Sequence, residues 1–270
     1  MFKSWWGNQI YSLVAQSVER LTVNQNVPGS SPGKGAKFMH KIKIFSHIID
    51  TPDSLMIFNN QFSLLKETGL LDLAYKIYLC VNGELYKFDT IQELVNQYHN
   101  VEIIHTNTSI EQYEYPTLNF LKENIDNDTD SYVLYFHVKG ASKNGSKDIR
   151  NWRFLLEYYN IINYQTCIDY LNNGYDTVGI LYREGFHSQW LHYSGNFWWA
   201  NSNHIKRLPK LPHPSDTLGG GNSKISMLPY MNENFRYDHE AWIGCVKPWN
   251  YISLFQDDIE EETSRIMKLC

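Results

Sequence analysis

The sequence SYVLYFHVKGAS, residues 131–142, begins as a run of apolar and aromatic side chains and ends on His137 and Lys139. An apolar run of this length, followed at once by Gly140, predicts a buried β-strand that stops at a turn. Both polar side chains would stand at the carboxyl end of that strand. In sheets of parallel strands, ligands bind at this end. The stretch therefore predicts a sheet that presents a histidine and a lysine at its functional edge.

The residues before this stretch alternate between two hydrophobic periods. Three segments rich in Ile, Val and aromatic residues predict strands, and the segments between them carry apolar residues at helical spacing. The predicted strands cover residues 41–49, 75–83 and 101–107, and the predicted helices cover 53–69, 90–100 and 115–125. Thr90 would cap the second helix, and Pro116 would open the third. This order predicts an α/β fold with a mostly parallel central sheet flanked by helices on both faces.

The ends of the other predicted strands are also polar, and they carry His47, Asn82 and His105. The carboxyl ends of parallel strands meet at one edge, so this edge would form a polar crevice. No GxGxxG or GxxxxGK[ST] sequence follows the first strand, which argues against a classical dinucleotide site and against a P-loop. A sugar nucleotidyltransferase would need a Gly-rich loop there, and SHIIDTPDS (46–54) is not one. The absence of a GxSxG elbow disfavours a Ser-His-Asp hydrolase.

The second half of the chain does not continue the regular alternation of strands and helices. Residues 146–174 predict one long amphipathic helix that ends at Gly174. A strand follows at 175–182. Residues 192–208 then read as a polar turn, an aromatic strand and a helix capped near Asn201 or Ser202. The Pro- and Gly-rich stretch 209–224 predicts a mobile loop, and the acidic stretch 257–265 predicts a solvated helix face.

Composition excludes several functional classes. The net charge is −5 and no cluster of Lys and Arg is present, which argues against a nucleic-acid partner. The four cysteines form no CxxC pair, which argues against a zinc ribbon and against a disulfide scaffold. No apolar run reaches the roughly 20 residues that span a bilayer. We therefore expect a cytoplasmic protein without a transmembrane segment, and peripheral contact with a membrane stays open.

Residues 1–38 do not fit the pattern of the rest. They show no helical or strand period and end in a Gly/Pro/Ser tract. VAQSVER (14–20) and GSSP (29–32) resemble the in-frame translation of the D-arm and T-arm of a transfer-RNA gene. We therefore predict that residues 1–38 are a disordered, non-domain extension from a mis-assigned start, and that a single domain covers residues 39–270. A genuine flexible tail is the alternative.

The order of elements, with NDTDSYVLYFHVK (127–139) as the fourth strand, resembles the GT-A nucleotide-sugar glycosyltransferases. The elements HVKG, NWR, YDTVG, HYSGNFWWANS and HEAWI look closer still to rhamnan-synthesis F-like bacterial and viral glycosyltransferases. Each element is short, but their order and spacing cover most of residues 100–244. The resemblance implies a Rossmann-like GT-A sandwich, with a nucleotide-binding half at 39–140 and an acceptor half at 141–270.

The resemblance also implies an activity. Such an enzyme moves a hexosyl or deoxyhexosyl group from a nucleotide-diphosphate donor to a glycan or lipid-linked acceptor in polysaccharide synthesis. The alternative is a non-catalytic protein on the same fold that binds a carbohydrate or a nucleotide-sugar. Thermal-shift screening of nucleoside diphosphates, with and without manganese, separates the two.

The family's Asp-x-Asp motif, which chelates a divalent cation such as manganese or magnesium, is replaced here by His137-Val138-Lys139. A histidine and a lysine cannot form a cage of oxygen ligands, so the metal requirement stays unknown. They could meet the diphosphate directly, with Lys139 as a point charge and His137 as a hydrogen-bond donor. The alternative is that both simply face water.

Trp152-Arg153 stands early in the long predicted helix. We predict that Arg153 forks onto the donor phosphates while Trp152 stacks beside them. The equally ordinary alternative places Trp152 in the core and leaves Arg153 along the surface.

The string HYSGNFWWANS (192–202) predicts the acceptor side. As an extended segment it would place alternating polar side chains on one face, and its glycine would let a substrate approach the backbone. Either tryptophan could present a flat ring to a pyranose, or both could pack in the core. The predicted acceptor- or sugar-binding residues are His192, Ser194, Gly195, Asn196, Trp198 and Trp199.

RYDHEAWIG (236–244) supplies two acidic residues. An inverting transferase needs a carboxylate that takes the proton of the acceptor hydroxyl. The matching family element has an acidic residue just before Trp-Ile, so Glu240 is the first candidate for this base and Asp238 the second. The alternative role for either residue is a favourable interaction with a helix dipole.

Overall fold

The computed structural model describes residues 40–83, 88–107, 109–128, 130–142, 146–184, 191–211, 236–247 and 249–268. The predicted extension at residues 1–38 lies outside the described residues, as do residues 212–224 of the predicted mobile loop. Among the described residues, no helix combines the length and the apolar character that crossing a bilayer requires.

A seven-stranded sheet forms the centre of the molecule, in the order β3-β2-β1-β4-β8-β5-β9. Its strands are β1 (Lys41–Ile49), β2 (Lys76–Asn82), β3 (Val101–Asn107), β4 (Ser131–His137), β5 (Thr177–Gly179), β8 (Trp198–Asn201) and β9 (Tyr251–Ser253). Strand β8 runs antiparallel to β4 and to β5, and the other neighbours pair in parallel. The mostly parallel sheet confirms the predicted α/β, Rossmann-like architecture, and the first four strands match their predicted ranges closely.

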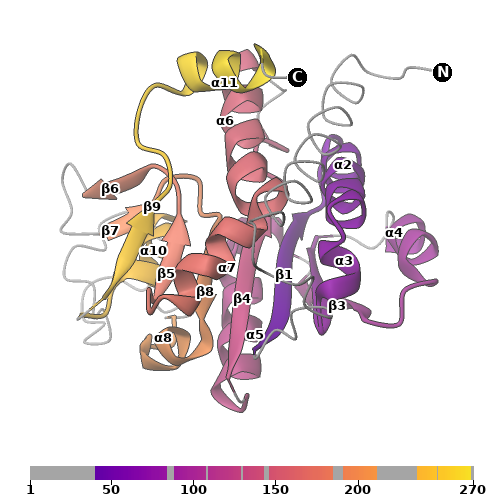
Figure 1. The fold of residues 1–270 in the computed structure, drawn as a ribbon. Helices are drawn as coiled ribbons and strands as arrows, with labels where there is room; N and C mark the ends of the chain where they lie inside the picture. The colour runs from indigo at the N-terminus through magenta and orange to yellow at the C-terminus, as the bar shows by residue number, and fades with distance from the viewer. Residues whose placement is uncertain are drawn as a thin grey trace, which may run out of the picture.

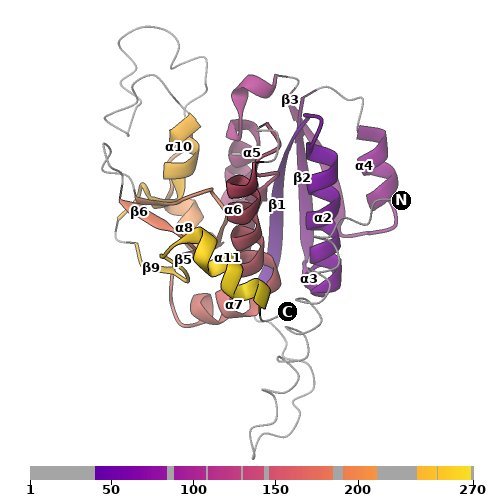
Figure 2. The ribbon, with the colours of Figure 1, turned by 90° about the horizontal axis from the view of Figure 1, so that it is seen from above.

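Helices cover both faces of this sheet (Figures 1 and 2). One face carries α2 (Ser54–Glu67), α3 (Leu70–Leu73), α6 (Lys147–Glu157) and α7 (Tyr164–Asn172), and the other carries α5 (Tyr115–Asp126) and α8 (Ser202–Arg207). Side chains alternate along each strand, so Ile44 of β1 enters the first core and Phe45 enters the second. The central strands β1, β2 and β4 are therefore largely buried on both sides, which explains why they read as continuous apolar runs.

Smaller elements complete the described part of the chain. They are α4 (Phe88–Val95), α10 (Arg236–Ala241), α11 (Ile259–Lys268), and a two-stranded sheet of β6 (Tyr182–Glu184) and β7 (Leu191–Tyr193). Helix α4 begins at Phe88, so Thr90 lies within this helix and the prediction that Thr90 caps it is wrong. The predicted cap of α8 is confirmed, because the Asn201 side chain accepts a hydrogen bond from the backbone N–H of His204 at 2.7 Å.

The helix predicted over 146–174 is interrupted. Helix α6 ends at Glu157, a π-helical turn spans Tyr158–Ile162, and α7 follows. The indole N–H of Trp199, on β8, donates to the carbonyl of Asn160 at 2.8 Å. A side chain that takes a carbonyl from the helical ladder is a recognised cause of such irregularity, and one sequence segment cannot reveal it.

The predicted polar turn before an aromatic strand is confirmed, because a turn at 194–196 separates β7 from β8. The interpretation of 192–197 as one extended segment is wrong, because Asn196 has a φ of +54°. The glycine within this turn, Gly195, has a φ of +92°. His192, Ser194 and Asn196 therefore do not share one face of a strand.

The chain changes its direction of travel across the sheet at β1. It adds β2 and β3 on one side of β1 and then returns to place β4 on the other side. The connection through α2 covers one face and the connection through α5 covers the opposite face. The segment that leaves β1 leads through α2 to β2, and the segment that leaves β4 leads through α6 and α7 to β5, on the other side of β1. The chain therefore diverges at the carboxyl ends of β1 and β4, which is where open α/β sheets bind ligands.

Gly179 of β5 provides a test of how tightly this sheet is packed. A Cβ atom at Gly179 would lie 2.6 Å from the ring of Tyr193. That ring cannot yield easily, because its hydroxyl bonds to Thr177 at 2.9 Å and to the Ile252 carbonyl at 3.0 Å. We expect Gly179→Ala to lower the free energy of unfolding by about 1–3 kcal/mol, measured by urea denaturation.

The matched control is Gly174→Asn. Gly174 has a φ of +88° and no heavy atom within 4 Å of an added Cβ, and asparagine tolerates this backbone conformation. Its effect should be smaller than that of Gly179→Ala. Equal stability of Gly179→Ala and the wild type would contradict the described packing of Tyr193.

Candidate functional site

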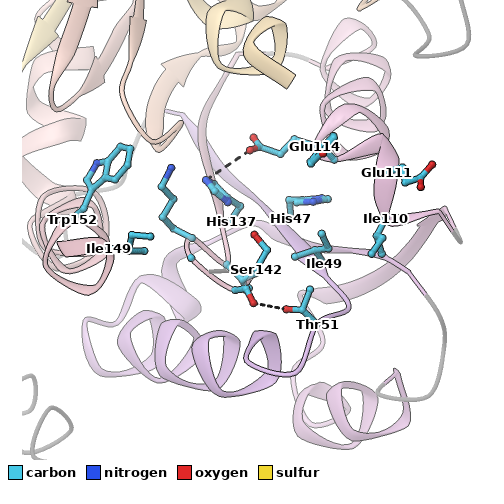
Figure 3. A pocket seen from close by; sticks show the side chains of 15 residues that line it. His47, Ile49, Thr51, Ile110, Glu111, Glu114, His137, Ser142, Ile149 and Trp152 are labelled. Atoms are coloured by element: carbon cyan, nitrogen blue, oxygen red, sulfur yellow. Dashed lines mark hydrogen bonds and ion pairs between the residues drawn. The ribbon is translucent and has the colours of Figure 1, made fainter. Parts of the chain in front are cut away.

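A cavity of about 350 Å³ lies at the carboxyl ends of β1 and β4 (Figure 3). Its volume falls within the range typical of ligand sites. Four segments line it: the end of β1, the stretch before α5, the turn after β4, and the first turns of α6. The lining residues are His47, Ile49, Thr51, Ile110, Glu111, Tyr113, Glu114, His137, Val138, Lys139, Gly140, Ala141, Ser142, Ile149 and Trp152.

The turn after β4 shapes the floor of the cavity. The Val138 N–H continues the sheet by donating to the carbonyl of His47 at 3.2 Å, and the Lys139 N–H turns back to the carbonyl of His137 at 2.7 Å. Gly140 then adopts a φ of +85°, and a Cβ atom there would lie 2.5 Å from the Ile149 side chain. Glycine is required at this position by both its backbone angle and its contact with α6.

Lys139 is the buried cation of this turn. The residue is 8% exposed and lines the cavity, and its Nζ lies 3.9 Å from the centre of the Trp152 ring. An ammonium over an indole face is stabilised by the negative potential of the ring, more strongly when water is excluded. A cation held this way can interact with an anionic ligand through a medium less polarisable than water.

Glu114 faces this turn from the far wall, in the sequence just before α5. One carboxylate oxygen accepts hydrogen bonds from the Tyr135 hydroxyl at 2.8 Å and the Asn196 amide at 2.5 Å. The other lies 3.8 Å from Nε2 of His137 (Figure 3). Burial, and secondly the charge of Glu114, raise the pKa of Tyr135 well above its usual range. The phenol therefore stays protonated and remains a donor to this carboxylate.

The two histidines at the strand ends differ in their surroundings. His137 donates from Nε2 to the carbonyl of Gly195 at 2.9 Å, and its ring meets Phe197 edge-on. His47 is buried, with Nδ1 2.8 Å from the Thr117 hydroxyl. Burial lowers the pKa of His47 to about 4, against the opposing charge of Glu114. His47 is therefore neutral at pH 7.

Three of the four residues predicted to bind the donor line the cavity: His137, Lys139 and Trp152. The fourth, Arg153, lies outside the described lining. Its Nη1 donates to the carbonyl of Lys139 at 3.0 Å, and its Nε lies 3.7 Å from the carboxylate of Glu157. In this structure, Arg153 therefore contacts the turn from behind.

The predicted acceptor residues are not gathered in the cavity. Trp198 and Trp199 are both 0% exposed, so protein covers their rings, which favours the core interpretation that the sequence left open. Gly195 and Asn196 lie behind the lining residues instead. The Gly195 carbonyl accepts a hydrogen bond from His137, and the Asn196 amide donates one to Glu114. His192 and Ser194 lie outside the described lining.

Asn196 makes only contacts within the protein among those described. Its amide oxygen accepts from the Trp198 indole at 2.8 Å, and its amide nitrogen donates to Glu114 and to the carbonyl of His239 at 3.3 Å. These bonds connect α10 to the cavity wall through one buried side chain. Asn196 therefore orients Glu114, and its side-chain amide donates to groups of the protein itself.

The two predicted bases lie on α10. Glu240 is half-buried and outside the described lining of the cavity, and the side chain of Asp238 lies outside the described residues. Sequence reasoning missed Glu114. The available signal was an acidic residue immediately before the helix that Pro116 opens, where the helix dipole favours a carboxylate.

The side chains at this edge bear on the question of a metal. Within the described ranges, no group of three or more His, Cys, Asp or Glu side chains is arranged to hold a metal ion. Lys139 adds a positive charge to the turn where the resemblance would place a carboxylate. The side chains described at this edge therefore supply no three-ligand set for a divalent cation.

The buried His47 makes stability depend on pH. Its folded pKa of about 4 lies below the ordinary value of 6.5, so the unfolded chain takes up the proton first as the pH falls. Above pH 6.5, His47 is neutral in both states and does not lower the free energy of unfolding. As the pH falls towards 4, protonation of His47 in the unfolded chain lowers the free energy of unfolding by about 3 kcal/mol. We expect His47→Gln to lose less stability than the wild type over this window, measured by urea unfolding at several pH values.

The control is His99→Gln, at an exposed position. This variant should follow the pH profile of the wild type. Parallel profiles for His47→Gln and the wild type would contradict the burial of a neutral imidazole at the end of β1.

Comparisons with known proteins show which family the chain belongs to. Among proteins with curated descriptions, none matches this chain. Solved structures that match this chain include the crystal structure of 4-diphosphocytidyl-2C-methyl-D-erythritol synthase, at 10% sequence identity and a TM-score of 0.40, over 85% of this chain and 97% of that one. A family model described as "Domain of unknown function (DUF8361)" matches residues 44–245, a stretch that contains every residue lining the cavity, and the chain therefore belongs to this family.

Proposed function

We propose that this protein is a glycosyltransferase of the GT-A type, which moves a hexosyl or deoxyhexosyl group from a nucleotide-diphosphate donor to a glycan or lipid-linked acceptor in polysaccharide synthesis. The observation that carries the proposal is a buried lysine in a cavity at the switch point of a mostly parallel sheet. Nucleotides bind at this place in open α/β sheets. A lysine is a common partner of phosphate.

The chemistry explains why a cation is useful there. An acceptor hydroxyl attacks the anomeric carbon while the bond from that carbon to the diphosphate oxygen breaks. Negative charge then grows on the leaving diphosphate, and a fixed positive group beside it lowers the barrier. In this proposal Lys139 supplies that charge from its place over Trp152, and His137 stands on the adjacent wall of the cavity.

Glu114 replaces Glu240 as the proposed base. A general base must reach the proton that it removes, and Glu114 lines the cavity whereas Glu240 does not. Hydrogen bonds from Tyr135 and Asn196 hold its carboxylate in place. The remaining oxygen, 3.8 Å from His137, is the proposed acceptor of the hydroxyl proton.

Tyr113 and Ile110 replace Trp198 and Trp199 as the residues proposed to pack against a sugar ring. They are 37% and 43% exposed and line the cavity, so they offer an apolar surface to a sugar or base ring. Tyr113 has a φ of 47° and a ψ of −128°, which is rare for a residue with a side chain. Asn82 holds it by donating to its carbonyl at 3.1 Å. Such strain is often retained at ligand sites.

The experiment has two stages. Thermal-shift measurements with uridine, thymidine, guanosine and cytidine diphosphates, each with and without manganese, test the donor site. Release of a nucleoside diphosphate from the matching nucleotide-sugar in the presence of acceptor glycans tests turnover. Binding without release would point to the alternative of a non-catalytic nucleotide-sugar-binding protein, and stabilisation by none of the four would reject the donor site.

Lys139→Met tests the proposed diphosphate contact. The variant keeps an unbranched apolar stem but removes the charge, so it should weaken binding of the preferred nucleoside diphosphate about tenfold or more. Isothermal titration calorimetry measures this change.

The control is Lys66→Met, at an exposed position in the last turn of α2. It removes the same charge from the chain but not from the cavity, so its affinity should equal that of the wild type. Unchanged affinity in Lys139→Met would rule out the diphosphate role of Lys139 even if nucleotides bind.

A further inference from the structure

Lys139 is held by two consecutive residues of α6. The Trp152 ring lies under its ammonium, with Nζ 3.9 Å from the ring centre. The next residue, Arg153, donates from Nη1 to its backbone carbonyl at 3.0 Å. One turn of one helix therefore contacts both the charged end of the lysine and its main chain.

A buried carboxylate lies one helical turn further along α6. Glu157 is 5% exposed, and its Oε1 lies 3.7 Å from Nε of Arg153. The same Oε1 accepts a hydrogen bond at 2.9 Å from Nε2 of Gln61, on α2. That nitrogen of Gln61, which is 0% exposed, also donates to the carbonyl of His137 at 3.0 Å.

These contacts converge on one turn. Arg153 binds the carbonyl of Lys139, Gln61 binds the carbonyl of His137, and both are joined to Glu157. The carbonyl groups after a strand end lack strand partners, so other donors must satisfy them. Here α2 and α6 supply those donors from behind the cavity.

Glu157 is the last residue of α6, directly before the helix break. The π-helical turn begins at Tyr158, directly after Glu157, and shares its face of the sheet with α2. Burial raises the pKa of Glu157, and the neighbouring Arg153 opposes this shift. A buried acid of this kind needs its partners, so removal of one leaves the others poorly compensated.

We propose that Arg153, with Glu157 and Gln61 behind it, is a positioning residue that fixes the turn of residues 137–140, so that His137 and Lys139 are held at the cavity before any ligand arrives. The part of this proposal that concerns ligand affinity rests on the proposed function. Arg153 does not itself touch the ligand. In this proposal Trp152 and Arg153 position Lys139 and do not bind the phosphates of a nucleotide.

Hydrogen exchange of the ligand-free chain tests the positioning directly. The amides of Val138, Lys139 and Ala141 are bonded within the turn or to β1. In Arg153→Met, we expect exchange of a peptide covering residues 136–142 to become about tenfold faster, with a peptide from β2 (76–82) unchanged. Arg153→Lys keeps the charge beside Glu157 but loses the planar fork, and it should show a smaller increase in the same peptide.

The control on the same helix is Lys147→Met. Lys147 pairs with Glu260 at 2.6 Å on the surface, with both side chains exposed. This variant should leave exchange of the turn as in the wild type. If Arg153→Met fails to fold, Arg153→Lys decides the question. Wild-type exchange of the turn in a folded Arg153 variant would overturn the proposal.

A double-mutant cycle separates positioning from direct contact with phosphate. Arg153→Met should weaken binding of the preferred nucleoside diphosphate about tenfold when Lys139 is present, and less than about twofold in the Lys139→Met background. Equal losses in both backgrounds would mean that Arg153 contacts the ligand itself, and would overturn the proposal. Failure of every nucleoside diphosphate to bind the wild type would reject the proposed transferase, and the exchange experiment would still decide the proposal.

Discussion

The parallel pairing of β1 with β4 is the constraint on which the site depends. In this register His47 stands opposite His137, so both strands end at the same level beside the switch in chain direction. The cavity opens directly above this pair, and its walls come from the segments that follow or precede the neighbouring helices. A shift of one residue would turn every side chain of β4 to the opposite face of the sheet.

The cavity combines two kinds of charge that are stabilised differently. The Trp152 ring contacts the ammonium group of Lys139, with Nζ 3.9 Å from the ring centre, and this contact stabilises a cation. Glu114 is held by hydrogen bonds from a phenol and an amide, which are neutral donors. A basic and an acidic side chain thus line one cavity, and the proposed function assigns the first to the leaving diphosphate and the second to the acceptor proton.

The sequence predicted the sheet better than it predicted the site, for identifiable reasons. Strands β1, β2 and β4 are largely buried on both faces, so their apolar runs mark them clearly. His137 and Lys139 were found because they end such a run. Trp198 and Trp199 were ambiguous because a flat ring suits both a core and a sugar. Glu114 and the role of Arg153 depend on partners such as Tyr135 and Lys139, which only the fold brings close.

The antiparallel strand β8 has a consequence for how the chain is made. It fills the place beside β4, yet its residues 198–201 follow β4 by a long stretch of sequence. Until that stretch leaves the ribosome, β4 is an edge strand with open hydrogen-bonding groups and a strongly apolar surface. Pairing between distant segments is slow to form. During synthesis, the sheet of the first four strands therefore has β4 as an unpaired edge that is open to other chains. Pairing with β8, which carries Trp198 and Trp199, covers this edge.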